Sequence, residues 1–259
     1  MPPIALTIAG SDPSGGAGIQ ADLKTFHQLG VYGASAITAV TAQNTVRASY
    51  TKILDATLVR QQIDAVLEDL PPNAVKTGAL GNAAIVTTVA QAVRASGATL
   101  VIDPVAVGKR GSALLDDDGF RALREVLIPV AALITPNLDE AERLADIPVR
   151  TTSEMRDAAR RIARLGVAAV LVKGGHLTGD AVDVLFTDGR YAEFRAGRID
   201  SRHTHGTGCT YSAAITAFLA HGFNLEEAIR RAKAYVTEAI RSAPRLGRGE
   251  GPLNHWAQG

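Results

Sequence analysis

The sequence predicts an α/β fold in which helices cover both faces of a mostly parallel sheet. Short apolar runs of strand length alternate with longer helical segments along nearly the whole chain, which is the pattern of repeated βα units. Two late runs, at 182–186 and 191–194, are joined by a turn that contains Asp-Gly and indicate a hairpin at an antiparallel edge. Glycine-rich and polar segments follow several strands. In such sheets ligands bind beyond the carboxyl ends of the strands, where these segments fall.

The order of the elements follows from local composition. An apolar run from Ile4 to Ala9 predicts the first strand, and a turn-rich segment separates it from a helix that continues to about Leu29. Further strands are expected at 34–40, near Val75, and at 99–102, 131–135 and 168–172, with helices at 56–70, 83–95, up to about Leu127, from Leu138, and at 153–165, 210–221 and 225–241. No linker, low-complexity tract or repeat interrupts them, so residues 1–259 are predicted to form a single domain.

The loop after the first strand contains a glycine pattern at residues 16–21, Gly-Ala-Gly-Ile-Gln-Ala. It fits the dinucleotide-binding fingerprint, but that motif needs an acidic residue near the end of the second strand. The chain reads Thr-Ala-Gln-Asn-Thr there, at 41–45. A nicotinamide or flavin site is therefore not expected, although a strand, a glycine loop and a helix in succession are still typical of a ligand-binding junction.

The composition favours small-molecule partners. Hydrophobic residues make up 46% and charged residues 20% of the chain, which is enough apolar material for a sizeable core. The 27 basic and 26 acidic residues give a net charge of +1, so neither a nucleic acid nor a membrane surface is indicated as a partner. No apolar run approaches the roughly 20 residues that span a bilayer. The single cysteine suits a reducing compartment, and the N-terminus lacks the pattern of a signal peptide, so a cytoplasmic location is expected.

The segment from Thr204 to Ser212 carries the strongest local signal. It holds two glycines, several hydroxyl residues and Cys209, and an apolar helical run follows it at once. Glycines at a helix N-terminus let the backbone close around an anion, and the helix dipole adds about half a positive charge there. The segment can also be an ordinary glycine-rich loop with a buried cysteine. Two nearby histidines lack a third ligand at metal spacing, so a zinc site is not indicated.

Other motifs at strand ends would suit phosphoryl transfer, which needs an anion cradle, a metal and nearby cations. Asn137 and Glu140 follow the strand at 131–135, where they can also be a helix cap and its capping-box partner. Asp103 precedes a proline after another strand, a position typical of turns. Lys173 lies before two glycines and can be a solvated loop residue. The chain has no Gly-x-x-x-x-Gly-Lys-Ser/Thr sequence, so its cradle would not be a P-loop.

Together these motifs resemble those of the hydroxymethylpyrimidine and phosphomethylpyrimidine kinases of thiamine synthesis, a branch of the ribokinase-like superfamily. The shared segments are Thr-His-Gly-Thr-Gly-Cys-Thr at 204–210, Thr-Pro-Asn-x-x-Glu at 135–140, Asp-Pro-Val at 103–105, Lys-Gly-Gly-His at 173–176, and the loops at 10–25 and 42–45. The resemblance covers the chain from Ile4 to about Trp256. It implies a three-layer ribokinase-like fold and a homodimer.

The resemblance also implies a reaction and its residues. Magnesium ATP would phosphorylate 4-amino-5-hydroxymethyl-2-methylpyrimidine and then its monophosphate. Cys209 would stand where most relatives of the superfamily carry an aspartate base, either removing the hydroxyl proton or only orienting the hydroxyl. The implied sites are the catalytic turn Gly206, Thr207, Gly208 and Cys209 with Lys109; the ATP contacts Lys109, Asn137, Lys173 and Thr207; the magnesium carboxylates Asp103 and Glu140; and the acceptor pocket Gly10, Ala17, Asp22, Gln43, Ala79 and Val105.

Two acceptor residues have a chemical rationale and an ordinary alternative. The carboxamide of Gln43 can pair with both the amine and the ring nitrogen of an aminopyrimidine, or it can simply end a strand. Asp22 can accept from the amine or the hydroxymethyl group, or it can lie on an exposed helix face. One departure is visible, because the family often has methionine where this chain has Ala79. A pyridoxal kinase of the cysteine-containing type is therefore the nearest alternative, and a ligand-sensing protein without turnover is a more distant one.

Overall fold

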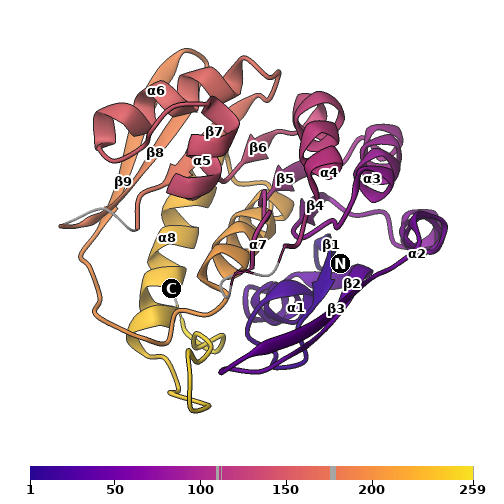
Figure 1. The fold of residues 1–259 in the computed structure, drawn as a ribbon, viewed down its shortest axis with the longest axis horizontal. Helices are drawn as coiled ribbons and strands as arrows, with labels where there is room; N and C mark the ends of the chain where they lie inside the picture. Colours follow the sequence, from indigo (N-terminus) through magenta and orange to yellow (C-terminus); the bar gives the residue numbers. More distant parts are fainter. Residues whose placement is uncertain (109–110, 112, 176–178, 259) are drawn as a thin grey trace.

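The computed structural model describes residues 1–108, 111, 113–175 and 179–258. Within these ranges, one nine-stranded sheet has the order β3-β2-β1-β4-β5-β6-β7-β8-β9 (Figure 1). The strands from β2 to β7 in this order are parallel, β3 pairs antiparallel with β2, and β8 and β9 form the other, antiparallel edge. The strands are β1 (Ile4–Ser11), β2 (Tyr32–Gln43), β3 (Ala48–Ile53), β4 (Ala74–Thr77), β5 (Thr99–Ile102), β6 (Leu133–Ile134), β7 (Ala169–Lys173), β8 (Ala181–Thr187) and β9 (Arg190–Ala196).

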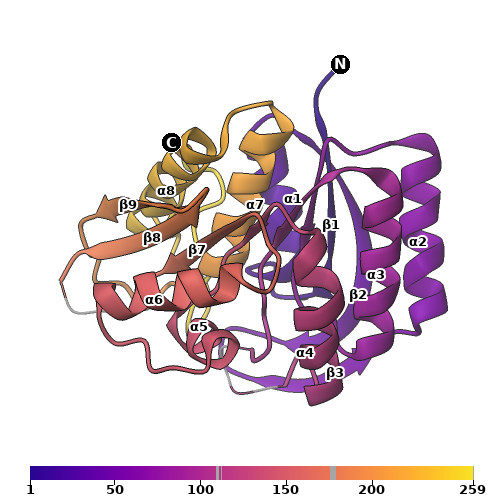
Figure 2. The same ribbon diagram turned by 90° about the horizontal axis from the view of Figure 1, so that it is seen from above.

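Helices cover both faces of the sheet, which Figure 2 shows from above. One layer contains α2 to α6, and the other contains α1, α7 and α8, with α7 packed between its two neighbours. The helices are α1 (Gly18–Gln28), α2 (Ala56–Asp69), α3 (Ala83–Ser96), α4 (Asp117–Ala122), α5 (Leu138–Ala145), α6 (Thr152–Ala163), α7 (Thr207–Ala220) and α8 (Leu225–Arg241). The predicted three-layer α/β fold is confirmed.

The central strands are buried because both faces carry helices. In β4 all four residues are buried, including Lys76, which matches the continuous burial typical of strands inside a parallel sheet. Side-chain caps start several helices, with Asn82 before α3, Thr151 before α6 and Asn224 before α8. The core therefore fixes the sheet rigidly and leaves the loops beyond its carboxyl edge to carry polar groups.

Four elements differ from the sequence expectation. Strand β3 was not predicted, because none of its residues is buried and only its pairing with β2 makes it a strand. The strand expected at 131–135 is reduced to β6, and α4 continues as a π-helical segment, Leu123–Leu127. Helix α7 begins at Thr207 rather than Thr210, so the glycine motif lies at the start of the helix itself.

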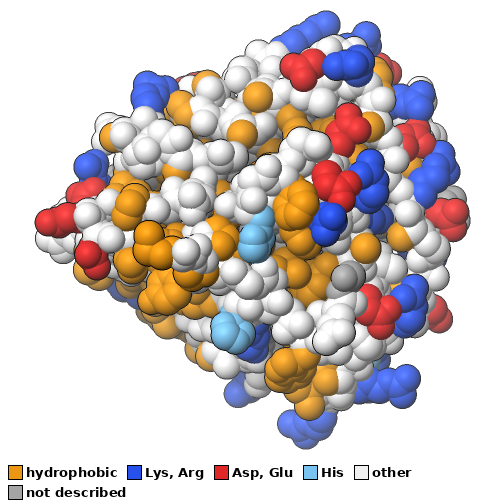
Figure 3. All heavy atoms as spheres, turned by 180° about the vertical axis from the view of Figure 1, so that it is seen from behind, with side chains coloured by type: hydrophobic (Ala, Val, Ile, Leu, Met, Phe, Trp, Pro, Cys, Tyr) orange, Lys and Arg blue, Asp and Glu red, His pale blue; other side chains and the backbone are white. Residues whose placement is uncertain are grey.

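The surface carries charges of both signs. On the face opposite to Figure 1, acidic and basic side chains lie mainly toward the rim, with hydrophobic and histidine side chains nearer the centre (Figure 3). The outer edge formed by β2 and β3 exposes large hydrophobic side chains, namely Tyr32, Val40 and Tyr50, with Val46 in the turn between the strands. None of the described helices is both long enough and apolar enough to cross a membrane.

Candidate active site

A cavity of about 670 Å³ lies at the carboxyl ends of the parallel strands. Its lining includes Ser11 at the end of β1, Gln43 at the end of β2, Asp103 just after β5 and Lys173 at the end of β7. The first turn of α7 closes the cavity from the helical layer, so residues 206–209 line it as well. Segments that are far apart in the sequence meet here because the parallel strands all end on the same side of the sheet.

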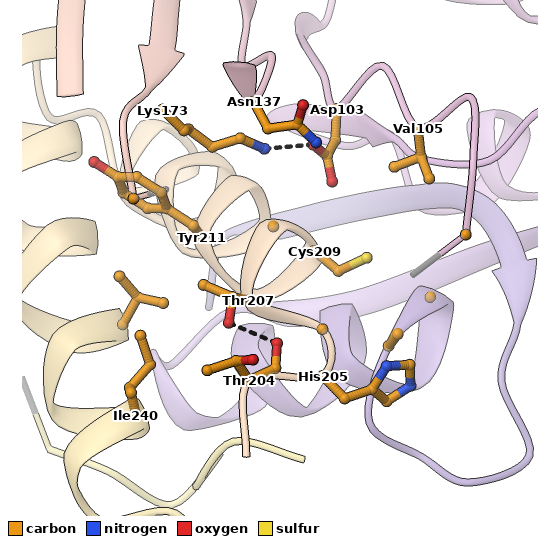
Figure 4. Close-up of a pocket in the computed structure, with 18 of the residues that line it drawn as sticks. Asp103, Val105, Asn137, Lys173, Thr204, His205, Thr207, Cys209, Tyr211 and Ile240 are labelled. Carbon is orange, nitrogen blue, oxygen red and sulfur yellow. Dashed lines mark hydrogen bonds and ion pairs between the residues drawn. The ribbon is translucent and has the colours of Figure 1, made fainter. Parts of the chain in front are cut away.

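The turn before α7 is built so closely that only glycine fits at its centre. Gly206 is the N-cap of the helix and has φ of 83°, and a Cβ atom there would lie 1.8 Å from the carbonyl oxygen of Gly16. The Thr207 hydroxyl donates to the carbonyl of Thr204 at 2.8 Å, which holds the turn in shape (Figure 4). The first N–H groups of a helix lack partners within it and lie at the positive end of its dipole, so this turn suits a phosphate group.

Asp103 and Lys173 form an ion pair on the wall of the cavity that faces the turn, with 2.9 Å between Lys173 Nζ and Asp103 Oδ1 (Figure 4). The pair lies next to the turn, because a Cβ atom on Gly208 would be 3.3 Å from Lys173 Nζ and 3.5 Å from Asp103 Oδ2. Burial alone would lower the pKa of Lys173, but the carboxylates of Asp103 and Glu140 raise it. Lys173 therefore stays a cation beside the anion-binding turn.

Asn137 and Glu140 form the complete capping box of α5. The Asn137 side chain accepts from the Glu140 backbone at 2.9 Å, and the Glu140 carboxylate accepts from the Asn137 backbone at 2.8 Å. Both residues also line the cavity. Burial raises the pKa of Glu140 to about 7, and the cation of Lys173 only partly offsets this. The capping interpretation is therefore correct, and it leaves the second carboxylate oxygen of Glu140 for another partner.

Asp103 and Glu140 are chemically suited to magnesium. Asp103 is only 2% exposed, and its Oδ2 is buried with no hydrogen-bond partner among the described residues, an arrangement that a cation would relieve. Magnesium is usually held by one or two carboxylates together with water and substrate phosphates. The described residues contain no cluster of three or more His, Cys, Asp or Glu side chains that would enclose a metal, which also fits a site completed by the substrate.

Cys209 lies in the first turn of α7, half-buried, and lines the cavity between this carboxylate wall and the acceptor end (Figure 4). Burial raises the pKa of the thiol to about 11, and the cation of Lys76 only partly offsets this. At neutral pH the thiol is therefore almost entirely protonated. A thiol in this state can orient a hydroxyl group, whereas a preformed thiolate would be rare.

The proposed acceptor residues Gly10, Ala17, Gln43, Ala79 and Val105 all line the cavity. The small ones leave room on one wall: a Cβ atom on Gly10 would lie 3.9 Å from the Ala79 methyl. Gly10, Ala39 and Ala79 carry at most a methyl group, so this part of the wall is built from small residues. Gln43 lies at the end of β2, where its carboxamide can meet a planar ring.

Asp22 does not line the cavity. Its side chain is fully buried, and it accepts from Lys76 Nζ at 2.8 and 2.9 Å and from the Thr7 hydroxyl at 2.6 Å. The interpretation as an exposed helix residue is wrong, and direct contact with an acceptor is not supported, because neither carboxylate oxygen is free. Lys76 does line the cavity, and the negative charge of Asp22 raises the lysine pKa against the effect of burial. Asp22 can thus act only through Lys76.

Sequence reasoning missed the buried pair formed by Asp12 and His205, with 2.8 Å between Asp12 Oδ2 and His205 Nε2. Both residues line the cavity and are nearly inaccessible, at 2% and 5% exposure. Asp12 stood in a turn-rich loop, where an aspartate is common, and His205 stood within the glycine motif. No local pattern could have paired them, because 193 residues separate them in the chain.

The far end of the cavity was not predicted either. It is lined by Tyr211 on α7, by Val236 and Ile240 on α8, and by Lys233, which donates to Asp183 at 2.7 Å. Tyr211 and Ile240 lie on the side of the turn remote from Val105 (Figure 4). The proposed phosphate cation Lys109, with Arg110 beside it, falls outside the described residues, as does His176.

The sequence of this chain matches a family model. Residues 12–254 fit the model described as phosphomethylpyrimidine kinase. The chain belongs to this family. It is 45% identical to the hydroxymethylpyrimidine/phosphomethylpyrimidine kinase of Bacillus subtilis, covering 98% of this chain and 94% of that one. It is also 51% identical to the thiamine biosynthesis bifunctional protein ThiED of Geobacter sulfurreducens over 96% of its own length, but it spans only about half, 51%, of that longer protein.

Solved structures agree with this family membership. The phosphomethylpyrimidine kinase of Clostridium difficile has a TM-score of 0.82 and 43% identity, covering 92% of this chain and 99% of that one. The Bacillus subtilis pyridoxal kinase, solved as an ADP complex, has a TM-score of 0.92 and 40% identity, covering 98% of both chains. The predicted resemblance to the kinase family is confirmed, and the chain is an ATP-dependent phosphotransferase of this family.

Proposed function

We propose that the cavity binds an aminopyrimidine alcohol and ATP side by side and phosphorylates the alcohol, then the resulting monophosphate, to supply thiamine synthesis. The observation that carries the proposal is the meeting of three groups in one cavity: the turn at 206–209, the Asp103–Lys173 pair and Gln43. A phosphate cradle, a cation and a planar polar contact are what this reaction requires. Family membership supports the same chemistry.

In this mechanism the backbone N–H groups of 206–209 hold the transferred phosphoryl group. Lys173 adds positive charge, and Asn137 and Thr207 contact the nucleotide phosphates; Lys109 is proposed for the same role on the strength of the resemblance. Asp103 and Glu140 would hold magnesium, which neutralises charge between the phosphates when it is bound. The apolar end near Val236 and Ile240 fits the nucleotide base, and the end near Gln43 and Val105 fits the acceptor ring.

Cys209 orients the acceptor hydroxyl toward the phosphorus atom. The oxygen of the hydroxyl forms the new P–O bond as the bond between that phosphorus and the leaving ADP breaks, and the hydroxyl proton passes late to an oxygen of the transferred phosphoryl group. Because the transition state of phosphoryl transfer is loose, little nucleophile activation is needed and positioning dominates. In the second step the acceptor is a phosphate oxygen, for which the same N–H groups and lysines provide the positive surroundings.

A pyridoxal acceptor is the second candidate. The broad wall at Gly10 and Ala79 favours it, because a more heavily substituted ring would fit there. The test is turnover of magnesium ATP by the purified protein with hydroxymethylpyrimidine, its monophosphate and pyridoxal in parallel assays. Rapid use of both pyrimidines is the expected result. Preference for pyridoxal would move the assignment to that vitamin, and no turnover of any acceptor would support a ligand-sensing protein instead.

The protein is further proposed to act as a homodimer in the cytoplasm, where ATP is abundant. The exposed side chains Tyr32, Val40, Val46 and Tyr50 provide an apolar edge that a second copy could cover. Light scattering coupled to gel filtration would test this, with Tyr50→Glu as the variant that should shift the mass to that of a monomer. An unshifted mass would move the interface elsewhere, and a monomeric wild type would end the proposal.

A further inference from the structure

Asp12 organises the loop that leads from β1 to α1. Its carboxylate accepts from the Ser14 backbone at 2.8 Å, the Ser14 hydroxyl at 2.7 Å, and the backbone N–H groups of Gly16 at 3.2 Å and Ala17 at 2.9 Å. The Asp12 backbone in turn donates to the side chain of Gln20 at 2.8 Å. The loop that carries the acceptor residue Ala17 is therefore shaped around one buried carboxylate.

His205 connects this loop to the anion-binding turn. Its Nε2 lies 2.8 Å from Asp12 Oδ2, and its Nδ1 is buried without a partner in the part of the chain that the structure describes, so the proton belongs on Nε2, where the carboxylate can accept it. The imidazole ring packs closely against the backbone of Gly16. A Cβ atom on Gly16 would lie only 2.7 Å from His205 Cδ2 and 3.1 Å from Pro252 Cβ. The residue after His205 is Gly206, the N-cap of α7.

The same loop reaches the acceptor end of the cavity. The backbone N–H of Ala17 donates to Asp12 Oδ2 at 2.9 Å. Ala17 and Gln43 both line the cavity. A series of contacts thus runs from Ala17 through Asp12 and His205 to Gly206.

Backbone contacts make this connection rigid. The Cβ position of Gly206 lies 1.8 Å from the Gly16 carbonyl oxygen, so the loop and the turn touch without any intervening side chain. A shift of the loop by a few tenths of an ångström must therefore move the turn, since packed interiors do not absorb such shifts. The acceptor side and the phosphate side of the cavity are therefore connected where Gly16 contacts Gly206.

We propose that Asp12 and His205 are a positioning pair that couples the two halves of the site, so that bound acceptor strengthens nucleotide binding and bound nucleotide strengthens acceptor binding. An acceptor held by Gln43 and Ala17 fixes the Asp12 loop, and through His205 it fixes the turn in the form that accepts phosphates. Linkage requires the effect to be equal in both directions. This inference rests on the proposed function, because it assumes an aminopyrimidine acceptor and ATP.

The test is calorimetric titration of hydroxymethylpyrimidine into the full chain, with and without a saturating non-hydrolysable ATP analogue. The ratio of the two dissociation constants measures the coupling directly. The variants are His205→Leu, which removes the donor, and His205→Gln, whose side-chain amide can still donate to Asp12. His221→Leu is the matched control, because His221 is exposed and bonds the Leu29 carbonyl at 2.8 Å away from the cavity.

The wild type and the His221→Leu control are expected to show coupling of at least about fivefold, the lower end of typical values. His205→Leu should reduce it below about twofold, and His205→Gln should retain most of it. Should His205→Leu fail to fold, Gly16→Ala provides the second test, since its methyl group would push the ring from Asp12 while leaving both polar groups in place.

Coupling that survives in His205→Leu, or in a folded Gly16→Ala variant, would overturn the inference. So would its absence in a wild-type protein that binds and phosphorylates the pyrimidine, although the proposed function would then stand. A wild type that binds no pyrimidine would overturn both. A purely structural role for the pair would weaken each ligand separately and leave the ratio unchanged, which also counts against the proposal.

Discussion

Replacing Cys209 with alanine is expected to affect the two phosphorylation steps unequally. The alcohol must lose a proton when its oxygen bonds to phosphorus, whereas a phosphate monoester is largely a dianion above about pH 6 and has none to lose. We expect kcat for the alcohol to fall about 100-fold, because without the thiol the hydroxyl is no longer held in line with phosphorus and a small misplacement of the reacting atoms can cost this much. The fall for the monophosphate should be less than about tenfold, because its phosphate oxygen is held by the N–H groups and lysines rather than by the thiol.

The magnitude follows from the thiol environment. Burial raises the pKa of Cys209 to about 11. At about pH 7.5 the gap is about 3.5 units, so roughly one thiol in 3,000 is ionised, and forming the thiolate costs about 4.8 kcal/mol. A mechanism that required the preformed thiolate would carry this cost, and its rate would rise about tenfold per pH unit up to the thiol pKa. An orienting thiol predicts a nearly flat profile instead.

The assay is a single-turnover measurement at saturating magnesium ATP between about pH 7 and pH 9, since it reports the chemical step rather than product release. Nucleotide affinity is measured by calorimetry for the wild type and for Cys209→Ala, and it should agree within about threefold, because the thiol is not assigned a nucleotide contact. A slope of one log unit per pH unit that disappears in Cys209→Ala would refute the orienting role. Equal losses for both acceptors, or a matching loss of nucleotide affinity, would point to a structural role.

Three further predictions follow from the site. Glu140→Gln preserves the capping box, because glutamine can also accept from the Asn137 backbone. The melting temperature of the variant should therefore stay within about 2 °C of the wild type, while its turnover falls at least about 100-fold. A matching loss of stability would mean that Glu140 serves only as a cap. Ala79→Met narrows the broad wall and should lower kcat/KM for pyridoxal about tenfold more than for the pyrimidine alcohol, and parallel losses would show that this wall does not select between them. Asp12→Asn should destabilise the protein by about 2 kcal/mol at neutral pH, measured by urea unfolding. Because the folded-state pKa of Asp12 is lowered, its stabilisation is present above the ordinary aspartate pKa of about 3.9 and lost as pH falls, so the difference between the two proteins should shrink below about pH 4, and a constant difference would contradict the role of the charge.

Much of the fold was predictable because each βα unit has a recognisable pattern in its local sequence. Runs such as Ile4 to Ala9 are apolar in themselves, and the segment 204–210 carries its chemistry within a few residues. Strand β3 was not predictable in this way, since none of its residues is buried and they become a strand only by pairing with β2. The roles of Asp12 and of Asp22 could not be read locally either, because each depends on a partner brought from a distant element.

The sequence predicted the backbone shape of the turn at 206–209, but it did not predict the buried ion pairs of the site. Gly206 was identified because a tight turn before a helix has few solutions, and its φ of 83° agrees. Asp22 was assigned to the acceptor from the resemblance, because a carboxylate can accept from the amine or the hydroxymethyl group. Its fully buried partner Lys76 lies on β4 and carries no local sign of burial beyond its neighbours.

The separation of Asp12 and His205 in the sequence also determines when the site can form during protein synthesis. The two residues are 193 positions apart, so at a ribosomal pace of about 5–20 residues per second the loop waits roughly 10–40 seconds for its partner. The first half of the sheet can emerge and pair during that interval, but the phosphate cradle and the acceptor loop cannot yet face each other. A nascent chain released before residue 205 would lack the turn at 206–209 and Cys209, so it could not complete the cavity.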